Sequence, residues 1–241
     1  MRFFAPALTD GERVDIDGLA VRLRVNERSR RVSLRIDPRT GEAVAIAPTA
    51  RRLPDAVAFA RTQRGWLAAR LKARPAASRL APGSWIEVFG EAWILIPDGR
   101  RPRFEGGALH GCGAGEVDAQ LVARAVKTAA LAQFRTLCER HCERLGVARP
   151  EVSATDPASR WGSCSPPASG RRGRVRMSWR LALAPLEVAD YVAAHECCHL
   201  IEANHGPRFW ALVRGLVGDP GRYRAWLRRH GGALLAFGAP T

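Results

Sequence analysis

The sequence predicts an α+β fold, with a β-rich N-terminal portion followed by a C-terminal portion in which helices dominate. Alternating apolar and polar residues recur in short runs before residue 97, and long stretches with helical apolar spacing follow residue 117. The chain has 241 residues, 46% of them hydrophobic, which is enough to bury a substantial core. A glycine-rich segment separates the two regions, so we expect a portion of residues 1–112 and a domain of residues 113–241.

Hairpins account for most of the expected strands. The run RVDIDGLAVRLRV (13–25) places Asp17-Gly18 between two alternating stretches, which is a strong signal for a tight hairpin turn. Residues 31–48 repeat the arrangement around a turn at Pro38–Gly41, and residues 84–97 predict a third hairpin.

One helix is expected among these hairpins. Residues 53–74 carry apolar side chains at helical spacing behind Pro54, so we predict a single amphipathic helix with Trp66 on its apolar face. The segment FEGGALHGCGAGE (104–116) is dense in glycine and is the expected linker.

The C-terminal portion predicts two helices and two strands. Residues 117–145 have few helix-breaking residues and form a long helix. Strands are expected at 150–155 and 174–183, joined through a turn-rich middle. Pro185 is favoured at the start of a helix and opens a second helix over residues 185–203.

Composition bounds the location and the partners. The N-terminus has no apolar core of signal-peptide length and no stretch is long enough to span a membrane, so we expect a cytoplasmic protein without a membrane partner. The net charge of +15 leaves nucleic acid open as a partner. The alternative is solvated charge, because only Lys72 and Lys127 are lysines among 38 basic residues, as codon bias in a GC-rich genome would produce.

The six cysteines contain no C-x-x-C pair, so neither a zinc ribbon nor a disulfide framework is indicated. Cys138 and Cys142 are one helical turn apart with His141 beside them. These three residues are either a second metal site or a pair of buried thiols that packs the helix.

The densest group of reactive side chains lies in AHECCHLIEANHGPRFW (194–210). His195 and His199 are four residues apart on the predicted helix, so both imidazoles project from one face and reach one ion. Glu196 stands beside the first histidine, where a carboxylate reaches a metal-activated water without binding the metal. This H-E-x-x-H spacing indicates a hydrolytic zinc site.

The third ligand depends on how the helix ends. On an unbroken helix His205 would lie about 120° away from the ligand face. The chain turns before that point, because Asn204 and Gly206 tolerate the left-handed conformation that ends helices. We expect this turn to return His205 to the metal. Two carboxylates compete with it for the position, those of Glu202 and Asp219.

Two separated motifs resemble those of a known family. SRWGSCS (159–165) and VRMSWRLALAPLEVADYVAAHECCHLIEANHGPRFWALV (175–213) are similar to the YgjP-like metallopeptidase family, whose relatives include the SprT-like proteins and which belongs to the zincins. The similarity is dense over residues 150–226. The chain departs from the family pattern at three positions, where Ser178 replaces Asn, Cys197 replaces Leu and Gly206 replaces Ser.

The resemblance implies a zincin-like catalytic domain with an H-E-x-x-H active-site helix. It also implies Zn²⁺ bound by His195, His199 and His205, and a peptide or protein substrate. Glu196 would deprotonate the zinc-activated water and later protonate the leaving amine. Because leucine can stand at position 197, Cys197 is interpreted as a core residue.

Several residues keep two interpretations. Cys198 is either core packing or a metal ligand, and Tyr191 and Tyr223 either pack or stabilise an oxyanion. The segment RWGSC is either a structural turn, with Trp161 in the core and Gly162 at an unusual backbone angle, or an edge strand that pairs with substrate. On the second interpretation the substrate-binding candidates are Arg160, Trp161, Gly162 and Ser163.

Two other functions stay open. A metal-dependent nucleotide phosphohydrolase would use the same activated water, although the site has no glycine-rich phosphate loop. A nucleic-acid-associated protease, by analogy with SprT-like relatives, would make use of the positive charge.

Overall fold

The computed structural model describes residues 8–37, 40–72, 80–168 and 170–237, and these form two compact units that divide between residues 77 and 78. Each unit has its own apolar core. The α+β class is confirmed. We expected the boundary near residue 112, but residues 80–112 belong to the second unit, because Ile86, Leu95 and Leu109 pack into the same core as the long helix that follows.

The N-terminal unit is a four-stranded sheet with two helices. Its strands are β1 (Arg13–Ile16), β2 (Leu19–Val25), β3 (Ser33–Ile36) and β4 (Ala43–Ala47), in the order β1-β2-β4-β3. Both predicted hairpins are confirmed, because β1 pairs antiparallel with β2 and β3 with β4. Asp17 and Gly18 both have positive φ, 50° and 85°, as a two-residue hairpin turn requires. Pro38 and Arg39 of the second predicted turn lie outside the described residues.

The single helix expected over residues 53–74 is two helices, α1 (Leu53–Thr62) and α2 (Arg64–Lys72), after the short 3-10 turn η1 (Ala50–Arg52). Trp66 was expected on the apolar face but is 46% exposed, whereas its neighbour Leu67 is fully buried. The helix breaks at Gln63, two residues before Gly65, and this break changes which residues face the sheet. Residues 73 and 74 of the predicted helix lie outside the described part.

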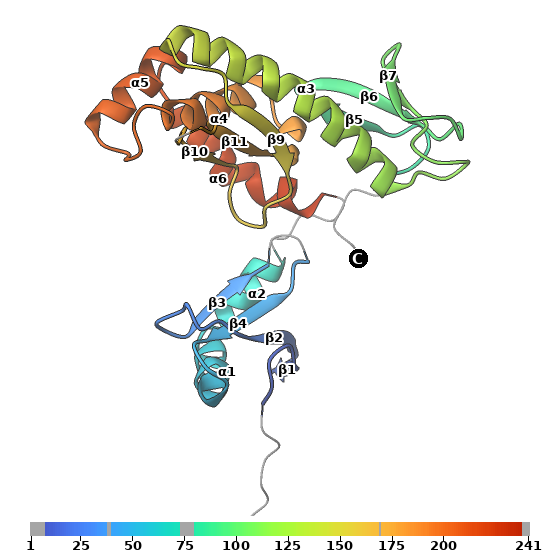
Figure 1. The fold of residues 1–241 in the computed structure, drawn as a ribbon. Coiled ribbons are helices and arrows are strands. Elements are labelled where there is room, and N and C mark those ends of the chain that lie inside the picture. Colours follow the sequence, from blue (N-terminus) through green and yellow to red (C-terminus); the bar gives the residue numbers. More distant parts are fainter. Residues whose placement is uncertain (1–7, 38–39, 73–79, 169, 238–241) are drawn as a thin grey trace, which may run out of the picture. The chain divides into compact units, whose positions relative to one another are not determined.

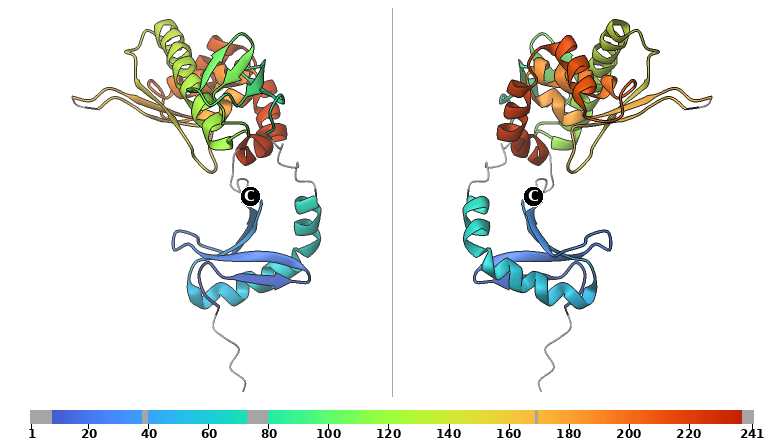
Figure 2. Two further views of the ribbon diagram at one scale, coloured as in Figure 1. Left: turned by 90° about the vertical axis from the view of Figure 1, so that its right-hand side faces the viewer. Right: turned by 90° about the vertical axis from the view of Figure 1, so that its left-hand side faces the viewer.

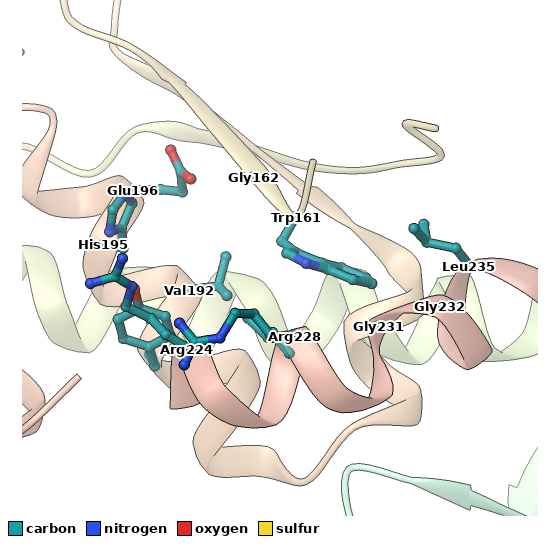
Figure 3. Close-up of a pocket in the computed structure, with 12 residues that line it drawn as sticks. Trp161, Gly162, Val192, His195, Glu196, Arg224, Arg228, Gly231, Gly232 and Leu235 are labelled. Carbon is teal, nitrogen blue, oxygen red and sulfur yellow. The ribbon is translucent and has the colours of Figure 1, made fainter. Parts of the chain in front are cut away.

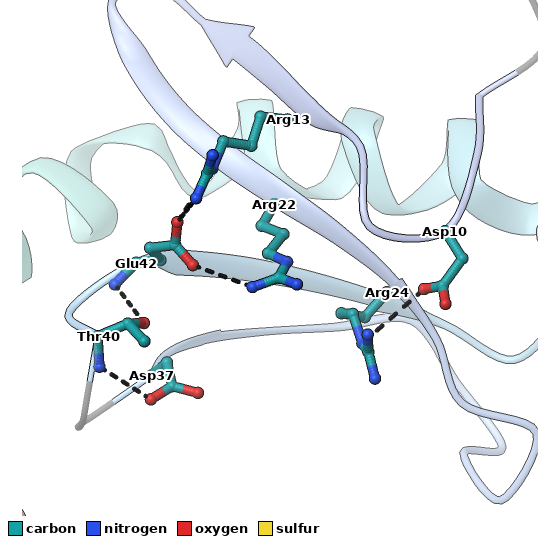
Figure 4. Close-up of polar contacts among 7 residues, drawn as sticks. All are labelled: Asp10, Arg13, Arg22, Arg24, Asp37, Thr40 and Glu42. Atoms are coloured by element: carbon teal, nitrogen blue, oxygen red, sulfur yellow. Dashed lines mark hydrogen bonds and ion pairs between the residues drawn. The ribbon is translucent and has the colours of Figure 1, made fainter. Parts of the chain in front are cut away.

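The sheet of this unit carries several arginines on strands β1 and β2, and the structure pairs them with acids (Figure 4). Glu42 accepts from Arg13 and lies 3.4 Å from Arg22, and Asp10 lies 3.8 Å from Arg24. Arg22 and Arg24 alternate with the buried Val21 and Leu23 along β2, so they occupy the face away from the core.

The second unit contains two sheets and the remaining helices. One sheet consists of β5 (Trp85–Val88), β6 (Glu91–Ile96), β7 (Arg103–Glu105) and β8 (Ala108–His110), in the order β5-β6-β8-β7. The other consists of β9 (Glu151–Thr155), β10 (Gly162–Ser165) and β11 (Arg174–Ser178), in the order β10-β11-β9. The helices are α3 (Ala119–Leu145), the 3-10 helix η2 (Trp179–Leu183), α4 (Leu186–Cys198), α5 (Pro207–Val217) and α6 (Gly221–Ala236).

The glycine-rich segment interpreted as a linker forms part of the first of these sheets. Gly106 and Gly107 make the turn of the β7–β8 hairpin with φ of 57° and 78°. A side chain at Gly113 would place its Cβ 1.8 Å from the Glu116 carbonyl oxygen. The glycines therefore permit tight turns and close backbone contacts inside a packed structure.

Helix α3 runs the length of the second unit, from the β5–β8 sheet to α5 (Figure 1). Its extent confirms the long predicted helix, and Asp118 caps its first turn. The hairpin at 84–97 and the strand at 150–155 are also confirmed. The strand predicted over 174–183 is wrong in its second half, which is η2: Trp179, Leu181 and Ala182 are all buried there, which an alternating strand with one solvent face does not achieve.

The β10–β11 hairpin extends outward from the helices (Figure 2). Its ladder runs from the pair Gly162–Met177 to the pair Ser165–Arg174, and an isolated bridge joins Ala168 to Arg171. On its other side β10 has no neighbouring strand in the described part of the chain. Strand β10 is therefore an edge strand.

Among the residues that the structure describes, no helix combines the length and the apolar character needed to cross a membrane.

The N-terminal cap of α3 is expected to stabilise the second unit. The Asp118 carboxylate accepts from the backbone N–H groups of Gln120, at 2.7 Å, and Leu121, at 3.3 Å. We expect Asp118→Ala to lower the free energy of unfolding of the second unit by about 1 kcal/mol, measured by urea denaturation. Asp118→Asn retains the acceptor and is expected to be close to neutral. Equal effects of the two substitutions would contradict a capping role.

Candidate metal centre

Helix α4 carries the first two side chains of the candidate metal centre. Nine of its thirteen residues are buried, and it contacts α3, α5, α6, η2 and the β10–β11 hairpin. His195 and Glu196 lie in its last turn, and His199 is the capping residue that follows Cys198. The helix therefore ends earlier than the predicted 203. Because α4 is packed on nearly every side, the backbone that carries these side chains has little freedom to move.

Three imidazoles meet beyond the end of this helix. The Nε2 atom of His205 lies 3.0 Å from Nε2 of His195 and 3.2 Å from Nε2 of His199. His205 arrives from the turn between α4 and α5, where the Gly206 N–H donates to the Asn204 carbonyl at 2.8 Å. The structure thus brings together the three histidines that the sequence nominated as ligands.

The orientation of His199 favours a cation between the rings. Its Nδ1 lies 2.9 Å from the backbone carbonyl oxygen of Glu202, which only accepts hydrogen bonds, so Nδ1 carries the proton. Its Nε2 is then a bare acceptor aimed at the other two rings. Two nitrogens bound to one tetrahedral zinc at about 2.0–2.1 Å are about 3.3 Å apart, close to the observed separations. The arrangement fits a zinc ion held by three neutral imidazoles.

Electrostatics keep His195 neutral. Burial, followed by the neighbouring His199 and His205, lowers the pKa of His195 to about 4. Its Nδ1 is buried and has no hydrogen-bond partner in the described structure. An uncharged imidazole is the form that binds a metal, so this environment suits the ligand role.

An aromatic floor supports the rings. Phe209 is fully buried, stacks on His199 at 4.5 Å between ring centroids, and makes edge contacts with His195 at 4.9 Å and His205 at 4.7 Å. Trp210 lies 5.9 Å from both His195 and His205. We did not nominate either aromatic residue from the sequence, although both belong to the NHGPRFW part of the recognised motif.

Glu196 is 6% exposed and is not one of the converging ligands. Burial raises the pKa of its carboxyl group to about 7, and the charge of Arg160 opposes that shift. The backbone of Gly162 lies directly against it: a Cβ on Gly162 would be 2.4 Å from Oε1 and 2.6 Å from Cγ of Glu196. Strand β10 therefore holds the carboxylate beside the histidines.

The alternative ligands take other roles. The Glu202 carboxylate faces Arg208 at 3.9 Å while its backbone carbonyl orients His199, and Asp219 accepts from the Gly221 N–H at 2.9 Å. Cys197 and Cys198 are fully buried in the core. In the described part of the chain, the three histidines are the only group of metal-binding side chains that converges.

The residues considered for a second metal site pack between helices. His141 is fully buried, and its Nε2 lies 2.6 Å from the Asp190 carboxylate of α4. The Cys142 sulfur lies 3.8 Å from that of Cys197. Both contacts join α3 to α4, as the packing alternative expected.

The nominated substrate-binding residues divide between two hollows that flank Glu196. The smaller, of about 330 Å³, contains Gly162, Ser163 and the three histidines. The larger, of about 570 Å³, begins at Trp161 and Gly162 and extends along α6 (Figure 3). Arg160 is exposed and lies near enough to influence Glu196. One of the two interpretations of RWGSC gave Gly162 an unusual backbone angle, but its φ is not positive, and the close approach of Glu196 is what requires glycine.

The tyrosines stack on one another, with 5.4 Å between ring centroids and planes 12° apart. Tyr191 also lies against His195 at 6.0 Å, and burial raises the pKa of its hydroxyl. Tyr191 lines the larger hollow, whereas the hydroxyl of Tyr223 accepts from Arg222.

Comparison with known families identifies one match. Residues 30–230 match the model of the YgjP-like, metallopeptidase domain. No curated protein and no solved structure gives a significant match.

The contact between Gly162 and Glu196 leads to a prediction. Gly162→Ala should displace the buried Glu196 carboxylate and lower any peptide hydrolysis that depends on this carboxylate by about 100-fold, because a misplacement of about 1 Å in a reacting group has an effect of this size. Metal content, measured by atomic emission, should stay unchanged, because the three atoms nearest the added Cβ all belong to Glu196 and none to a histidine. Gly215→Ala is the matched control, since a Cβ there has no atom within 4 Å. A fully active Gly162→Ala variant would mean that β10 does not position Glu196.

Proposed function

The chain belongs to the YgjP-like family of metallopeptidases, and from this premise we propose that it is a zinc-dependent peptidase with His195, His199 and His205 as ligands. Glu196 is its general base. The observation that carries the proposal is the convergence of three Nε2 atoms beside one buried carboxylate that does not join them.

Zinc is the metal that suits this donor set. Imidazole nitrogens favour zinc and neighbouring transition metals over calcium or magnesium, which take oxygen ligands. Catalytic zinc sites use three protein ligands and keep a fourth position open. Here all three histidines line the smaller hollow, and His205 is exposed while His195 and His199 are half-buried, so a substrate could reach a metal held by them. A divalent cation bound there would polarise the substrate carbonyl and make water acidic near neutral pH.

The chain's own residues supply the proton transfers. Glu196 lies beside the histidines but is not one of the three converging side chains, so its carboxylate accepts the proton of the attacking water and returns it to the departing amine. Gly162 holds that carboxylate in place. Phe209 and the Glu202 carbonyl fix the rings of the ligands.

The free edge of β10 gives a peptide a place to bind. An extended substrate that pairs with this strand would run past Ser163 and Gly162 and bring its backbone to Glu196. Pairing through the main chain is independent of side chains. It favours an extended peptide over a compact substrate.

The other two functions have less support. Among the described residues, no glycine-rich loop lines either hollow, so the site lacks the backbone N–H cradle that commonly binds a triphosphate. Nucleic-acid binding through the N-terminal sheet is disfavoured by the ion pairs of Arg13, Arg22 and Arg24. A cytoplasmic location stays part of the proposal.

Three substitutions separate base, ligand and packing. Glu196→Gln keeps the size of the side chain but removes the proton acceptor, so the variant should bind one zinc per chain and lose about 100-fold or more in turnover of an unstructured protein such as casein. His205→Ala should bind zinc more weakly, because two imidazoles are left. Cys198→Ala should keep its zinc and lose only some stability.

Zinc content and hydrolysis are measured on the same preparations, with nucleoside triphosphates as a second substrate. Loss of zinc from Cys198→Ala but not from His205→Ala would show that the third ligand is misassigned. Zinc-dependent hydrolysis of triphosphates without cleavage of any peptide would replace the peptidase by a phosphohydrolase.

A further inference from the structure

The larger hollow beside Glu196 has a composition that the proposed chemistry does not explain. We call it the α4–α6 pocket, because it lies between those helices and is closed at one side by Trp161. Its volume of about 570 Å³ is large enough for a side chain or a chain terminus. Val192, Leu227 and Leu235 supply apolar surface.

Two cations line this apolar pocket. Arg224 and Arg228 are four residues apart on α6, so both project from the same face of the helix. Figure 3 shows them toward the end where His195 and Glu196 lie, with Trp161 and Leu235 toward the other end. Arg224 lies over the Trp210 ring at 5.3 Å, and its charge contributes to the lowered pKa of His195.

No acidic group in the described part of the chain forms an ion pair with these two arginines. Within residues 8–237, as far as the structure describes them, no carboxylate comes within ion-pairing distance of either guanidinium group. Among the residues that the structure describes, Glu196 is the one acidic residue that lines the pocket, and its proposed role is proton transfer. The pocket therefore combines apolar walls with two exposed arginines that no carboxylate pairs with in the described part of the chain.

The pocket is adjacent to the reacting centre. Gly162, His195 and Glu196 line both this pocket and the smaller hollow that holds the three histidines. A peptide whose backbone follows β10 past Glu196 therefore places a neighbouring group at the mouth of the pocket. Gly231 allows α6 to lie directly against the Trp161 ring, because a Cβ at this position would be 2.8 Å from the ring.

We propose that the α4–α6 pocket binds a carboxylate carried on a short apolar stem, which pairs with Arg224 and Arg228. The carboxylate belongs to an acidic side chain next to the cleaved bond or to the free C-terminus of the substrate. This selectivity rests on the proposed peptidase function. Guanidinium groups favour carboxylates because their paired N–H donors match the two oxygens.

Cleavage of matched peptides tests the selectivity. A series of octapeptides carries one glutamate or one glutamine at each position in turn, with either a free or an amidated C-terminus, and mass spectrometry locates the cleaved bond. The glutamate peptides test whether the pocket binds a side-chain carboxylate. The peptides with a free C-terminus test whether it binds the terminal carboxylate. We expect kcat/KM to be about 10-fold higher for the preferred carboxylate than for its amide.

Arginine substitutions connect that preference to the pocket. Arg228→Ala should abolish the preference, and Arg228→Glu should reverse it toward lysine at the same position. Arg229→Ala is the matched control, because Arg229 is the next residue on α6, is exposed as Arg228 is, and does not line the pocket. A preference that survives Arg228→Ala, or that Arg229→Ala removes equally, would overturn the assignment.

Binding without catalysis separates this inference from the peptidase proposal. Metal-free Glu196→Gln protein is titrated with the same peptides by calorimetry. We expect the carboxylate peptides to bind about 10-fold more tightly than their amides, with the difference lost in the Arg228→Ala background. Equal affinities overturn the pocket assignment even if peptides are cleaved. Selective binding without cleavage of any peptide supports the pocket and overturns the peptidase.

Discussion

The burial of α4 is the constraint on which the second unit depends. Two sides of this helix make different contacts, because helical spacing points their side chains in different directions. Asp190 and Cys197 contact α3, through His141 and Cys142, and lie about two turns apart on one stripe. His195 and Glu196 lie on the side that faces β10 and α6. Any shift of α4 that moved the histidines would also break its contacts with α3.

This division explains why Cys197 is not a ligand although it adjoins Glu196. Successive residues on a helix point about 100° apart. A side chain next to the base therefore faces the core when the base faces the cleft. The fully buried cysteines serve as small apolar groups where α3 approaches closely, and a larger side chain would need more space at the interface.

Features with local causes could be predicted from the sequence. Asp17-Gly18, the long helix and the H-E-x-x-H spacing each depend on a few neighbouring residues, and the structure contains all three elements. The return of His205 to the other histidines was also expected, because Asn204 and Gly206 indicate a turn. The break between α1 and α2, the change from β11 to η2 and the membership of residues 80–112 depend on which partner each segment packs against. Sequence periodicity does not contain that information.

Gly162 shows the same limit inside the site. The sequence offers only that a glycine stands in RWGSC, and an unusual backbone angle is the common reason for one. The actual reason is a side chain from a helix more than thirty residues later, which leaves no space for a Cβ. Gly231 of α6 likewise has no space for a Cβ, because the Trp161 ring lies directly against it at the edge of the α4–α6 pocket. Two glycines thus shape the cleft through contacts that are distant in sequence.

Charge gives the clearest case in which position matters more than composition. A net charge of +15 does not distinguish arginines that are paired, buried or free. Arg13 and Arg22 share Glu42, and the buried Arg180 pairs with Asp156, so these residues stabilise structure and attract no ligand. Arg224 and Arg228 have apolar surface and Glu196 as neighbours in a pocket. Both are exposed to solvent, and no carboxylate in the described part of the chain pairs with either, so they are available to an anionic ligand. The selectivity of the site therefore follows from where two arginines lie and not from how many the chain contains.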